Sequence, residues 1–315
     1  MLVTSILVAI VWFAGTYTSM VDYEIWNGSI TDKAKIRVSC THSYTCNCVT
    51  TCNGKKCTTI CQTCYEHSND WDWMVYSTVG EFNINRVDRR GSDAPPRWTQ
   101  VQKNEPASRP HRYTNYIKAV PDSLFSKRNI DLSQYNIPEY PEVYDYYRYS
   151  RVLSVSDVDI SFANKLNTVL NTELKILGAK SEVNIIIVFT DAGPEYKYAL
   201  ESAWIGGKKN DVIVVVGTSS PPVIDWVEVI TLGLNSGNEY LGVVLGDKLR
   251  TTTLDNPDEF AYTIVSTVGE HFDRKPMQDF EYLKDDIEPP TWLLILTIVI
   301  SLLISGGLTF YFKNN

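Results

Sequence analysis

Val-Asn-Ile-Ile-Ile-Val-Phe at residues 183–189 and Val-Ile-Val-Val-Val at residues 212–216 are the two stretches that decide the fold. Each is a short run of mainly β-branched residues, which is typical of a strand buried on both faces of a sheet. A helical face lies between them, formed by Tyr196, Ala199, Leu200, Ala203 and Trp204. This order predicts a βαβ unit with parallel strands and a right-handed crossover.

A longer amphipathic helix precedes this unit. Apolar residues recur at helical spacing from Phe162 to Leu177, so one face of the segment is apolar. Asp159 or Ser161 is expected to cap its first turn, and Gly178 stands where the residue after a helix C-terminus usually lies.

Further elements complete the predicted domain. Residues 223–230 and 240–245 are expected to be two more strands, and residues 258–273 a last helix. Residues 154–275 are therefore predicted to form an α/β domain, in which helices pack on a short sheet. Residues 276–290 form an acidic linker that follows it.

Both ends of the chain are apolar. Residues 291–312 contain no charged residue, and about 20 apolar residues suffice for a helix to cross a bilayer. Residues 1–21 are less uniformly apolar and predict either an uncleaved anchor or a cleaved secretory signal. Either alternative places the middle of the chain across the membrane, and the flanking charges favour cytoplasmic termini.

The C-terminal apolar segment carries small residues on one face: Ser301, Ser305 and Gly306. Small residues let helices approach closely in lipid, where association depends on packing. We expect this face to contact the N-terminal apolar segment or a second copy of the chain in a homo-oligomer.

All seven cysteines lie in one window: Cys40, Cys46, Cys48, Cys52, Cys57, Cys61 and Cys64. The window is poor in aliphatic residues, so cross-links or a metal must stabilise it. In an oxidising compartment we expect three disulfides and one odd thiol, in a pairing that the sequence leaves open. In a reducing compartment, Cys61-x-x-Cys64 and Cys46-x-Cys48, with His42 or His67, would suit tetrahedral zinc.

The cysteine window belongs to a β-rich region, residues 22–112. Residues 71–87 within it predict a hairpin that turns at Gly80, and Asn27-Gly28-Ser29 matches a glycosylation acceptor. Residues 113–153 follow as a connector rich in Pro and Tyr, which we expect to lie over the α/β domain.

Four acidic residues stand near the predicted strands: Asp157, Asp159, Asp191 and Asp211. If three of them converged, they would suit Ca²⁺ or Mg²⁺ in a phosphatase, because a metal neutralises phosphoryl charge and activates water. The alternative is structural, with Asp159 as a helix cap and Asp191 as a turn residue.

Other functional signatures are missing from the sequence. It has no Gly-rich phosphate loop, no Gly-x-Ser-x-Gly and no His-Glu-x-x-His motif. The formal net charge is −8 and the basic residues are scattered, which argues against nucleic-acid binding.

Ala-Leu-Glu-Ser-Ala-Trp-Ile-Gly-Gly-Lys-Lys-Asn-Asp-Val at residues 199–212 resembles the centre of a TPM domain. In that family a helix ends in a Trp-x-Gly type turn, and a basic, Asn-rich loop leads into an aliphatic strand. The resemblance covers residues 154–275 and implies a TPM-like fold between an N-terminal signal and a C-terminal membrane helix. The layout is also similar to that of membrane proteins of tailed phages.

The TPM resemblance implies two kinds of role. Some members are acid phosphatases or metal binders, and others repair membrane proteins or serve as auxiliary subunits of membrane complexes. We expect a membrane-anchored, extracytoplasmic interaction or assembly protein without catalysis, on the periplasmic side of an inner membrane if the host is a bacterium. Its expected partners are the bilayer and a membrane or envelope protein. The alternative is a metal-dependent phosphatase.

Overall fold

The computed structural model describes residues 2–120, 130–232 and 238–314. The chain divides into two compact units. The first unit contains residues 1–27, 110–142 and 149–315, and the second contains residues 28–109 and 143–148.

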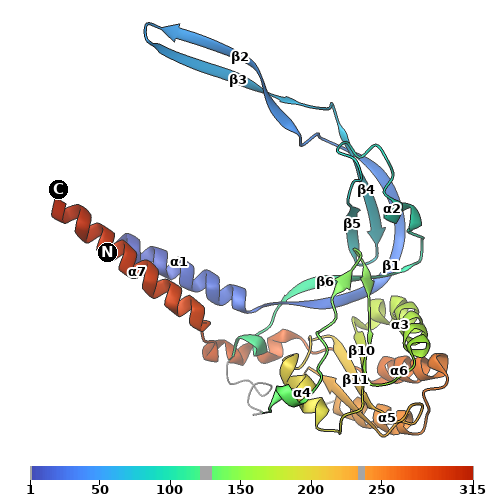
Figure 1. Ribbon diagram of the computed structural model, residues 1–315. Coiled ribbons are helices and arrows are strands. Elements are labelled where there is room, and N and C mark those ends of the chain that lie inside the picture. Colours follow the sequence, from blue (N-terminus) through green and yellow to red (C-terminus); the bar gives the residue numbers. More distant parts are fainter. Residues whose placement is uncertain (1, 121–129, 233–237, 315) are drawn as a thin grey trace. The chain divides into compact units, whose positions relative to one another are not determined.

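The α/β part of the first unit is built on a four-stranded sheet in the order β12-β11-β10-β9 (Figure 1). Its strands are β9 (Val152–Val155), β10 (Asn184–Thr190), β11 (Asp211–Gly217) and β12 (Trp226–Thr231). β10 is parallel to β9 and β11, whereas β12 is antiparallel to β11. With α4 (Tyr196–Ala203) between β10 and β11, the predicted βαβ unit is present.

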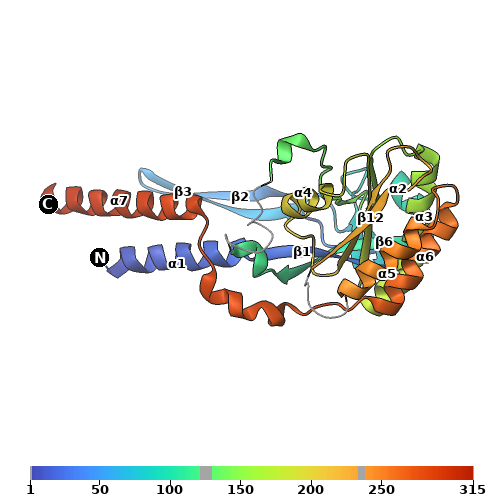
Figure 2. The ribbon, with the colours of Figure 1, turned by 90° about the horizontal axis from the view of Figure 1, so that it is seen from below.

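Three further helices form the core with this sheet: α3 (Ile160–Ser181), α5 (Asn238–Arg250) and α6 (Pro257–His271). They lie in a row beside the sheet (Figures 1 and 2). Leu166 of α3, Ile187 of β10 and Ile264 of α6 belong to one continuous apolar cluster. Every residue of β10 and β11 is buried, which explains their almost uninterrupted β-branched sequence.

The strand predicted at residues 240–245 is wrong, because this segment lies inside α5. Leu241, Leu245 and Leu249 are fully buried and recur at every fourth residue, so they form one helix face. A short apolar run has no periodicity that separates a strand from a buried helix turn.

Gly178 does not follow the end of a helix, contrary to the prediction. α3 continues to Ser181, and Glu182 takes the left-handed conformation with φ 48°. A Cβ on Gly178 would lie 2.6 Å from the Cβ of Asn27. The glycine therefore permits a close approach of the chain at Asn27.

A turn with three consecutive positive φ angles joins α4 to β11. Ile205, Gly206 and Gly207 have φ angles of 52°, 73° and 80°. Glycine has no Cβ to clash in this region, which explains its use at two of the three positions. This turn is the Trp-x-Gly stretch on which the TPM resemblance rests.

The apolar ends of the chain are helices: α1 (Leu2–Ser19) and α7 (Thr291–Asn314). Among the described residues, Thr291–Tyr311 is the one helix long and apolar enough to cross a membrane, and Val8–Ser19 is a shorter apolar stretch. The two helices run side by side (Figures 1 and 2). Gly15 is buried against Leu293, whose side chain a Cβ on Gly15 would overlap.

The predicted small-residue face is only partly covered among the described residues. Ser301 is half-buried, Ser305 and Gly306 are exposed, and a Cβ on Gly306 would have nothing within 4 Å. Leu293, in the first turn of α7, is one residue that contacts α1. Packing of the small-residue face, against the N-terminal segment or a second copy, stays a prediction.

The second unit is built on another four-stranded sheet, in the order β5-β4-β1-β6. Its strands are β1 (Val21–Val38), β4 (Asp70–Ser77), β5 (Gly80–Ile84) and β6 (Pro106–Thr114), and the ends of β1 and β6 extend into the first unit. β4 and β5 form the predicted hairpin around Gly80. Trp73, Val75 and Ile84 are buried in its core.

A separate pair of strands, β2 (Ser43–Asn53) and β3 (Lys56–Tyr65), interrupts the chain between β1 and β4. The remaining short elements are α2 (Pro96–Gln100), η1 (Ile117–Ala119), η2 (Leu132–Gln134), β7 (Val143–Tyr144), β8 (Arg148–Tyr149) and η3 (Met277–Asp286).

Replacing the two helix glycines Gly178 and Gly242 with alanine should have opposite effects. Alanine favours a helix over glycine by about 1 kcal/mol. At Gly242 the new Cβ would meet the Cβ of Val229 at an ordinary 3.7 Å, so Gly242→Ala should raise the melting temperature. At Gly178 the clash with Asn27 should outweigh the higher helix propensity of alanine, so Gly178→Ala should lower the melting temperature. Thermal unfolding of the full chain in detergent measures both, and stabilisation by Gly178→Ala would contradict the close approach.

Candidate binding ribbon and metal centre

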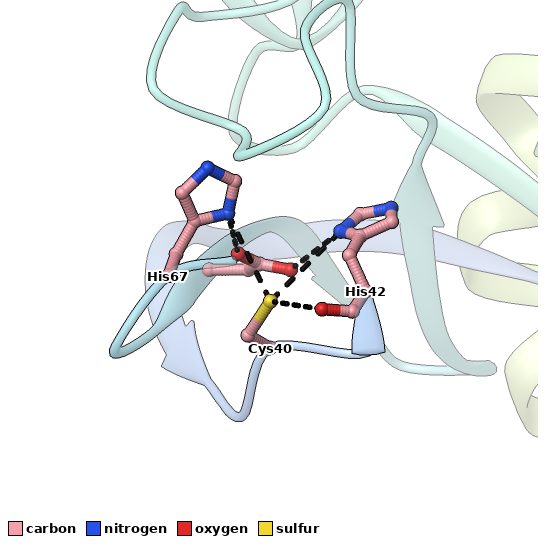
Figure 3. A group of neighbouring side chains, drawn as sticks. Cys40, His42 and His67 are labelled. Atoms are coloured by element: carbon pink, nitrogen blue, oxygen red, sulfur yellow. Dashed lines mark hydrogen bonds and ion pairs between the residues drawn. The ribbon is translucent and has the colours of Figure 1, made fainter. Parts of the chain in front are cut away.

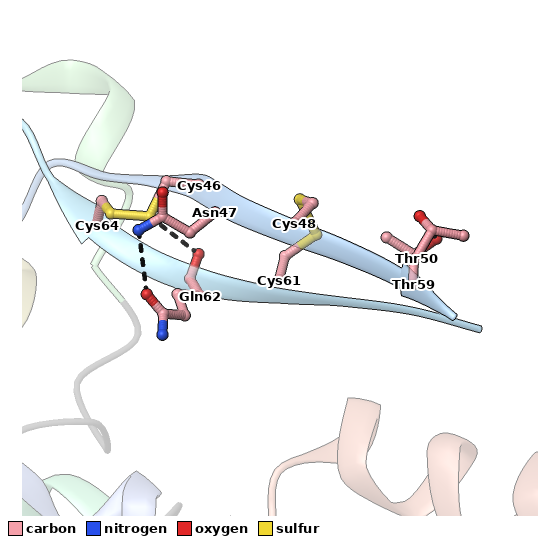
Figure 4. The surroundings of a disulfide bond; sticks show 8 residues. All are labelled: Cys46, Asn47, Cys48, Thr50, Thr59, Cys61, Gln62 and Cys64. Atoms are coloured by element: carbon pink, nitrogen blue, oxygen red, sulfur yellow. Dashed lines mark hydrogen bonds between the residues drawn. A yellow bond between two sulfur atoms is a disulfide. The ribbon is translucent and has the colours of Figure 1, made fainter. Parts of the chain in front are cut away.

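β2 and β3 form a long antiparallel ribbon, residues 43–65, with a tight turn at Gly54. Three nested disulfides cross it: Cys46–Cys64, Cys48–Cys61 and Cys52–Cys57. Figure 4 shows the first two as rungs between the strands. The expectation of three disulfides and one odd thiol is thus met, with Cys40 as the free cysteine.

The register of the ribbon explains why these cysteines meet. Cys52 and Cys57 are direct cross-strand partners. Closer to the base, the register shifts between Cys46 and Val49, where Asn47 has a φ of 47° and its amide donates to Gln62 Oε1 at 3.2 Å (Figure 4). This is a β-bulge, which inserts an extra residue into one strand.

The ribbon has no hydrophobic core. Apart from Cys46 and Cys64, which are half-buried, every residue of β2 and β3 is exposed. An isolated two-stranded hairpin is marginally stable in water. A disulfide that closes a loop of about 15 residues contributes about 3 kcal/mol, so the cross-links replace a core as the source of stability.

The zinc site suggested by Cys61-x-x-Cys64 and Cys46-x-Cys48 is not formed, because disulfides occupy these cysteines. A different group of potential ligands forms instead, from Cys40, His42, His67 and Asp70. One ligand atom from each residue lies within 4.8 Å of all the others. It is the one such group of His, Cys and acidic side chains within the described part of the chain.

The four residues Cys40, His42, His67 and Asp70 are called the CHHD cluster here, and Figure 3 shows Cys40 beside His42 and His67. Cys40 Sγ lies 4.0 Å from His42 Nδ1 and 3.8 Å from His67 Nδ1. The carboxylate of Asp70 lies 3.5 Å from His42 Nδ1 and 3.2 Å from His67 Nδ1. Cys40 and Asp70 are buried, whereas about a quarter of each imidazole side chain is exposed.

The cluster lies at the neck, the two short segments that connect the sheet to the ribbon (residues 39–42 and 66–69). Val38, at the end of β1, pairs with Asp70, at the start of β4. On the ribbon side, Glu66 N donates to His42 O at 3.0 Å. Two antiparallel ladders therefore place Cys40 and His42 opposite His67 and Asp70, although the whole ribbon separates the pairs in sequence.

Asp70 is held ionised by its neighbours. Burial alone would raise its pKa, but hydrogen bonds from Arg86 and from the cluster itself outweigh burial and keep the pKa below the usual value. Arg86 Nη1 lies 3.0 Å from Asp70 Oδ2, and the same guanidinium also pairs with Asp72. The cluster thus contains a buried carboxylate that is oriented by an arginine.

The four acidic residues of the α/β domain do not converge on one site. Asp159 caps α3 by accepting hydrogen bonds from the amides of Ser161 and Phe162, as in the structural alternative. Asp157 and Asp191 are exposed. Asp211 lies at the opposite end of the sheet from Asp191, because it begins β11 and Asp191 follows β10. A strand of seven residues separates these ends by about 20 Å.

The surroundings of Asp211 indicate a structural role for this side chain. It is buried and accepts hydrogen bonds from Asn184 Nδ2 at 2.8 Å, Tyr140 OH at 2.8 Å and Lys208 N at 2.7 Å. Burial outweighs these bonds and raises its pKa to about 6. Tyr140 belongs to the tyrosine-rich connector, which is also bound through Asn136 O and Pro138 O to side chains of Tyr196 and Trp204.

Asn27, the glycosylation acceptor of the sequence motif, is buried. Its Nδ2 donates to Val183 O at 3.0 Å, and its Oδ1 accepts from Arg151. This side chain is not available to carry a glycan in the folded protein. Arg151 is itself fully buried and binds Asn171 and Asn184, and burial lowers its pKa to about 10. No local sequence pattern predicts this network, because its members lie far apart in the chain.

Comparisons with protein-family models, with curated proteins and with solved structures found no match to this chain.

Non-reducing peptide mapping should recover the three nested cysteine pairs. Alkylation after denaturation without reductant should label Cys40 alone, because the other six cysteines are cross-linked. After reduction, all seven should be labelled. A map that pairs Cys40, or that joins Cys61 to Cys64, would contradict the register of the ribbon.

Asp211 should make the folded protein less stable as the pH rises from about 4 to about 7. Its folded pKa is about 6, against about 3.9 for an unfolded aspartate, so folding favours the protonated carboxyl. The resulting loss is about 3 kcal/mol once both states are ionised.

Melting curves of the full chain in detergent at several pH values test this. Asp211→Asn should flatten the pH dependence, and Tyr140→Phe should extend it to higher pH because it removes a hydrogen bond to the carboxylate. If the melting temperature of Asp211→Asn depended on pH as steeply as that of the unchanged protein, another titrating group would be responsible.

Proposed function

We propose that this chain is a membrane-anchored, extracytoplasmic interaction protein that presents the disulfide ribbon to a protein partner. In this proposal the α/β domain is a TPM-like platform without catalysis, and the helices α1 and α7 anchor it. The partner is a membrane or envelope protein.

The ribbon is the observation that carries the proposal. It is stabilised by three cross-links but contributes no side chain to a hydrophobic core. Val49 and Ile60, which face each other across the strands, are 65% and 71% exposed. Exposed apolar side chains on a rigid, protruding strand pair are typical of a surface that a partner covers.

The backbone and charge of the ribbon indicate the kind of partner. Both strands are edges with unpaired backbone groups, to which an extended segment of another protein can add. Residues 43–65 contain no acidic residue, and Lys55 and Lys56 lie at the tip. A protein that offers a strand edge and an acidic surface fits both features.

The disulfides support the extracytoplasmic location. Such bonds persist in oxidising compartments and are rare in the cytosol. The candidate span Thr291–Tyr311 and the antiparallel packing of α1 on α7 are consistent with both termini on the same side of a bilayer. The ribbon would then lie on the other side, together with the α/β domain.

The phosphatase alternative has no comparable support. Its metal required three converging carboxylates, and the structure leaves Asp157 and Asp191 exposed and Asp211 at the other end of the sheet. We therefore interpret Asp157 as an ordinary surface residue, Asp159 as the cap of α3 and Asp191 as a turn residue.

Topology is tested with reporters in intact cells. A reporter fused after Asn315 should remain cytoplasmic, whereas one inserted at Gly91 should be translocated. External protease should cleave the exposed loop around Arg89. Cleavage only after the membrane is permeabilised would reverse the proposed orientation.

Partner binding is tested with a photo-crosslinking amino acid placed at Ile60 in native membranes. Ile176, which is 72% exposed on α3, is the matched control position. The expected result is one discrete crosslinked product from Ile60 and from Val49 but not from Ile176. Lys55→Glu with Lys56→Glu should abolish it, because the tip would then repel an acidic partner. Equal products at Ile60 and Ile176, or none at Ile60, would contradict the proposal.

A further inference from the structure

We propose that Cys40, His42, His67 and Asp70 bind one Zn²⁺ ion, which closes the neck at the base of the ribbon. The proposal concerns a metal site and is independent of the partner proposed above. It rests on the geometry, chemistry and surroundings of the CHHD cluster.

The spacing of the ligand atoms is close to that of a tetrahedral zinc site. Zinc bonds are about 2.0–2.2 Å to nitrogen and oxygen and about 2.3 Å to sulfur, so the corners of the tetrahedron lie about 3.3–3.7 Å apart. The Cys40 sulfur lies 4.0 and 3.8 Å from the two imidazole nitrogens, while Asp70 Oδ2 lies 3.5 Å from His42 Nδ1 and Asp70 Oδ1 lies 3.2 Å from His67 Nδ1. One ligand atom from each residue lies within 4.8 Å of all the others, so shifts of up to about 1 Å bring four such atoms onto one ion.

The ligand types select zinc among the common cations. Calcium and magnesium prefer oxygen ligands, whereas a set of one sulfur, two imidazole nitrogens and one carboxylate suits zinc. A Cys40 thiolate and the Asp70 carboxylate carry two negative charges, which would neutralise the ion. Four protein ligands leave no open position, so the site is structural and not catalytic.

The surroundings of the cluster resemble those of metal sites in proteins. Metal-bound carboxylates are usually oriented by a further hydrogen bond, and Arg86 donates one to Asp70 Oδ2 at 3.0 Å. Asp70 is fully buried and Cys40 is 6% exposed, so the two charged ligands are protected from solvent. The partly exposed imidazoles of His42 and His67 leave a path by which the ion can enter.

The position of the cluster gives the ion a mechanical role. Between the β1–β4 ladder, which ends at the Val38–Asp70 pair, and the β2–β3 ladder, which begins at the Ser43–Tyr65 pair, a backbone hydrogen bond from Glu66 N to His42 O joins the two sides of the neck. An ion that joins residues 40 and 42 to residues 67 and 70 would bridge the neck and restrict bending of the ribbon. The disulfides cannot do this, because all three lie beyond it.

The competing explanation is a cluster joined only by hydrogen bonds. Both imidazoles could donate from Nδ1 to Asp70, with the Cys40 thiol beside them. Such a cluster would need no metal. The two explanations differ in the zinc content of the protein and in the reactivity of Cys40.

The full chain, purified in detergent without reductant, should contain one zinc per chain by mass spectrometry of the metal. After a chelator removes it, Co²⁺ should restore one equivalent and give the absorption of a thiolate-bound tetrahedral cobalt ion. Cys40 should react with a thiol reagent in the stripped protein and be protected when Zn²⁺ is added.

Variants locate the ion. Cys40→Ser and His67→Gln should each weaken zinc binding by more than about a hundredfold, because loss of even an outer partner costs about ten- to a hundredfold. His111→Gln, which changes a histidine outside the cluster, should retain one zinc. The three disulfides, mapped in each variant, distinguish a lost ligand from a misfolded ribbon.

Three results would overturn the proposal: no zinc in the purified protein together with no Co²⁺ uptake by the stripped protein, another metal in stoichiometric amount in place of zinc, or unchanged zinc in Cys40→Ser. Failure of the ribbon to crosslink a partner would leave the zinc content unaffected. The two proposals can therefore fail separately.

Discussion

The antiparallel ladder between β1 and β4 is the constraint on which the second unit depends. Its register pairs Val38 with Asp70 and so fixes where the chain leaves the sheet and where it returns. Everything between these residues must fit a neck and a ribbon whose strands start side by side. The CHHD cluster and the nested disulfides lie along these two aligned segments, and the bulge at Asn47 adjusts the register within the ribbon.

In the first unit, buried polar groups perform a related task. β1 begins with Asp22 and Glu24, which pair with Lys208 at 2.7 Å and with Arg274 at 2.6 Å. Asn27 then binds the buried Arg151. A buried charge without a partner is strongly destabilising, so these pairs specify one position of residues 22–27 within the first unit.

Part of the candidate site could be predicted from composition. The clustering of seven cysteines in a segment poor in aliphatic residues predicts cross-links or a metal, because the segment cannot bury a core of its own. The pairing could not be derived, since it depends on the bulge at Asn47 and on the position of the turn. The metal ligands could not be grouped for a similar reason: Cys40, His42 and His67 lie in or next to the cysteine window, but Asp70 lies outside it and belongs to no motif.

The sequence by itself determined the local elements whose pattern is periodic and long. The buried strands β10 and β11, the helices α3 and α6 and the apolar ends follow from residue type and spacing, which act over a few neighbours. Only the tertiary structure decided that residues 240–245 are helical, that Gly178 admits Asn27 and that Cys40 meets Asp70. These outcomes depend on contacts between residues far apart in the chain, and local spacing carries no information about which distant groups will be neighbours.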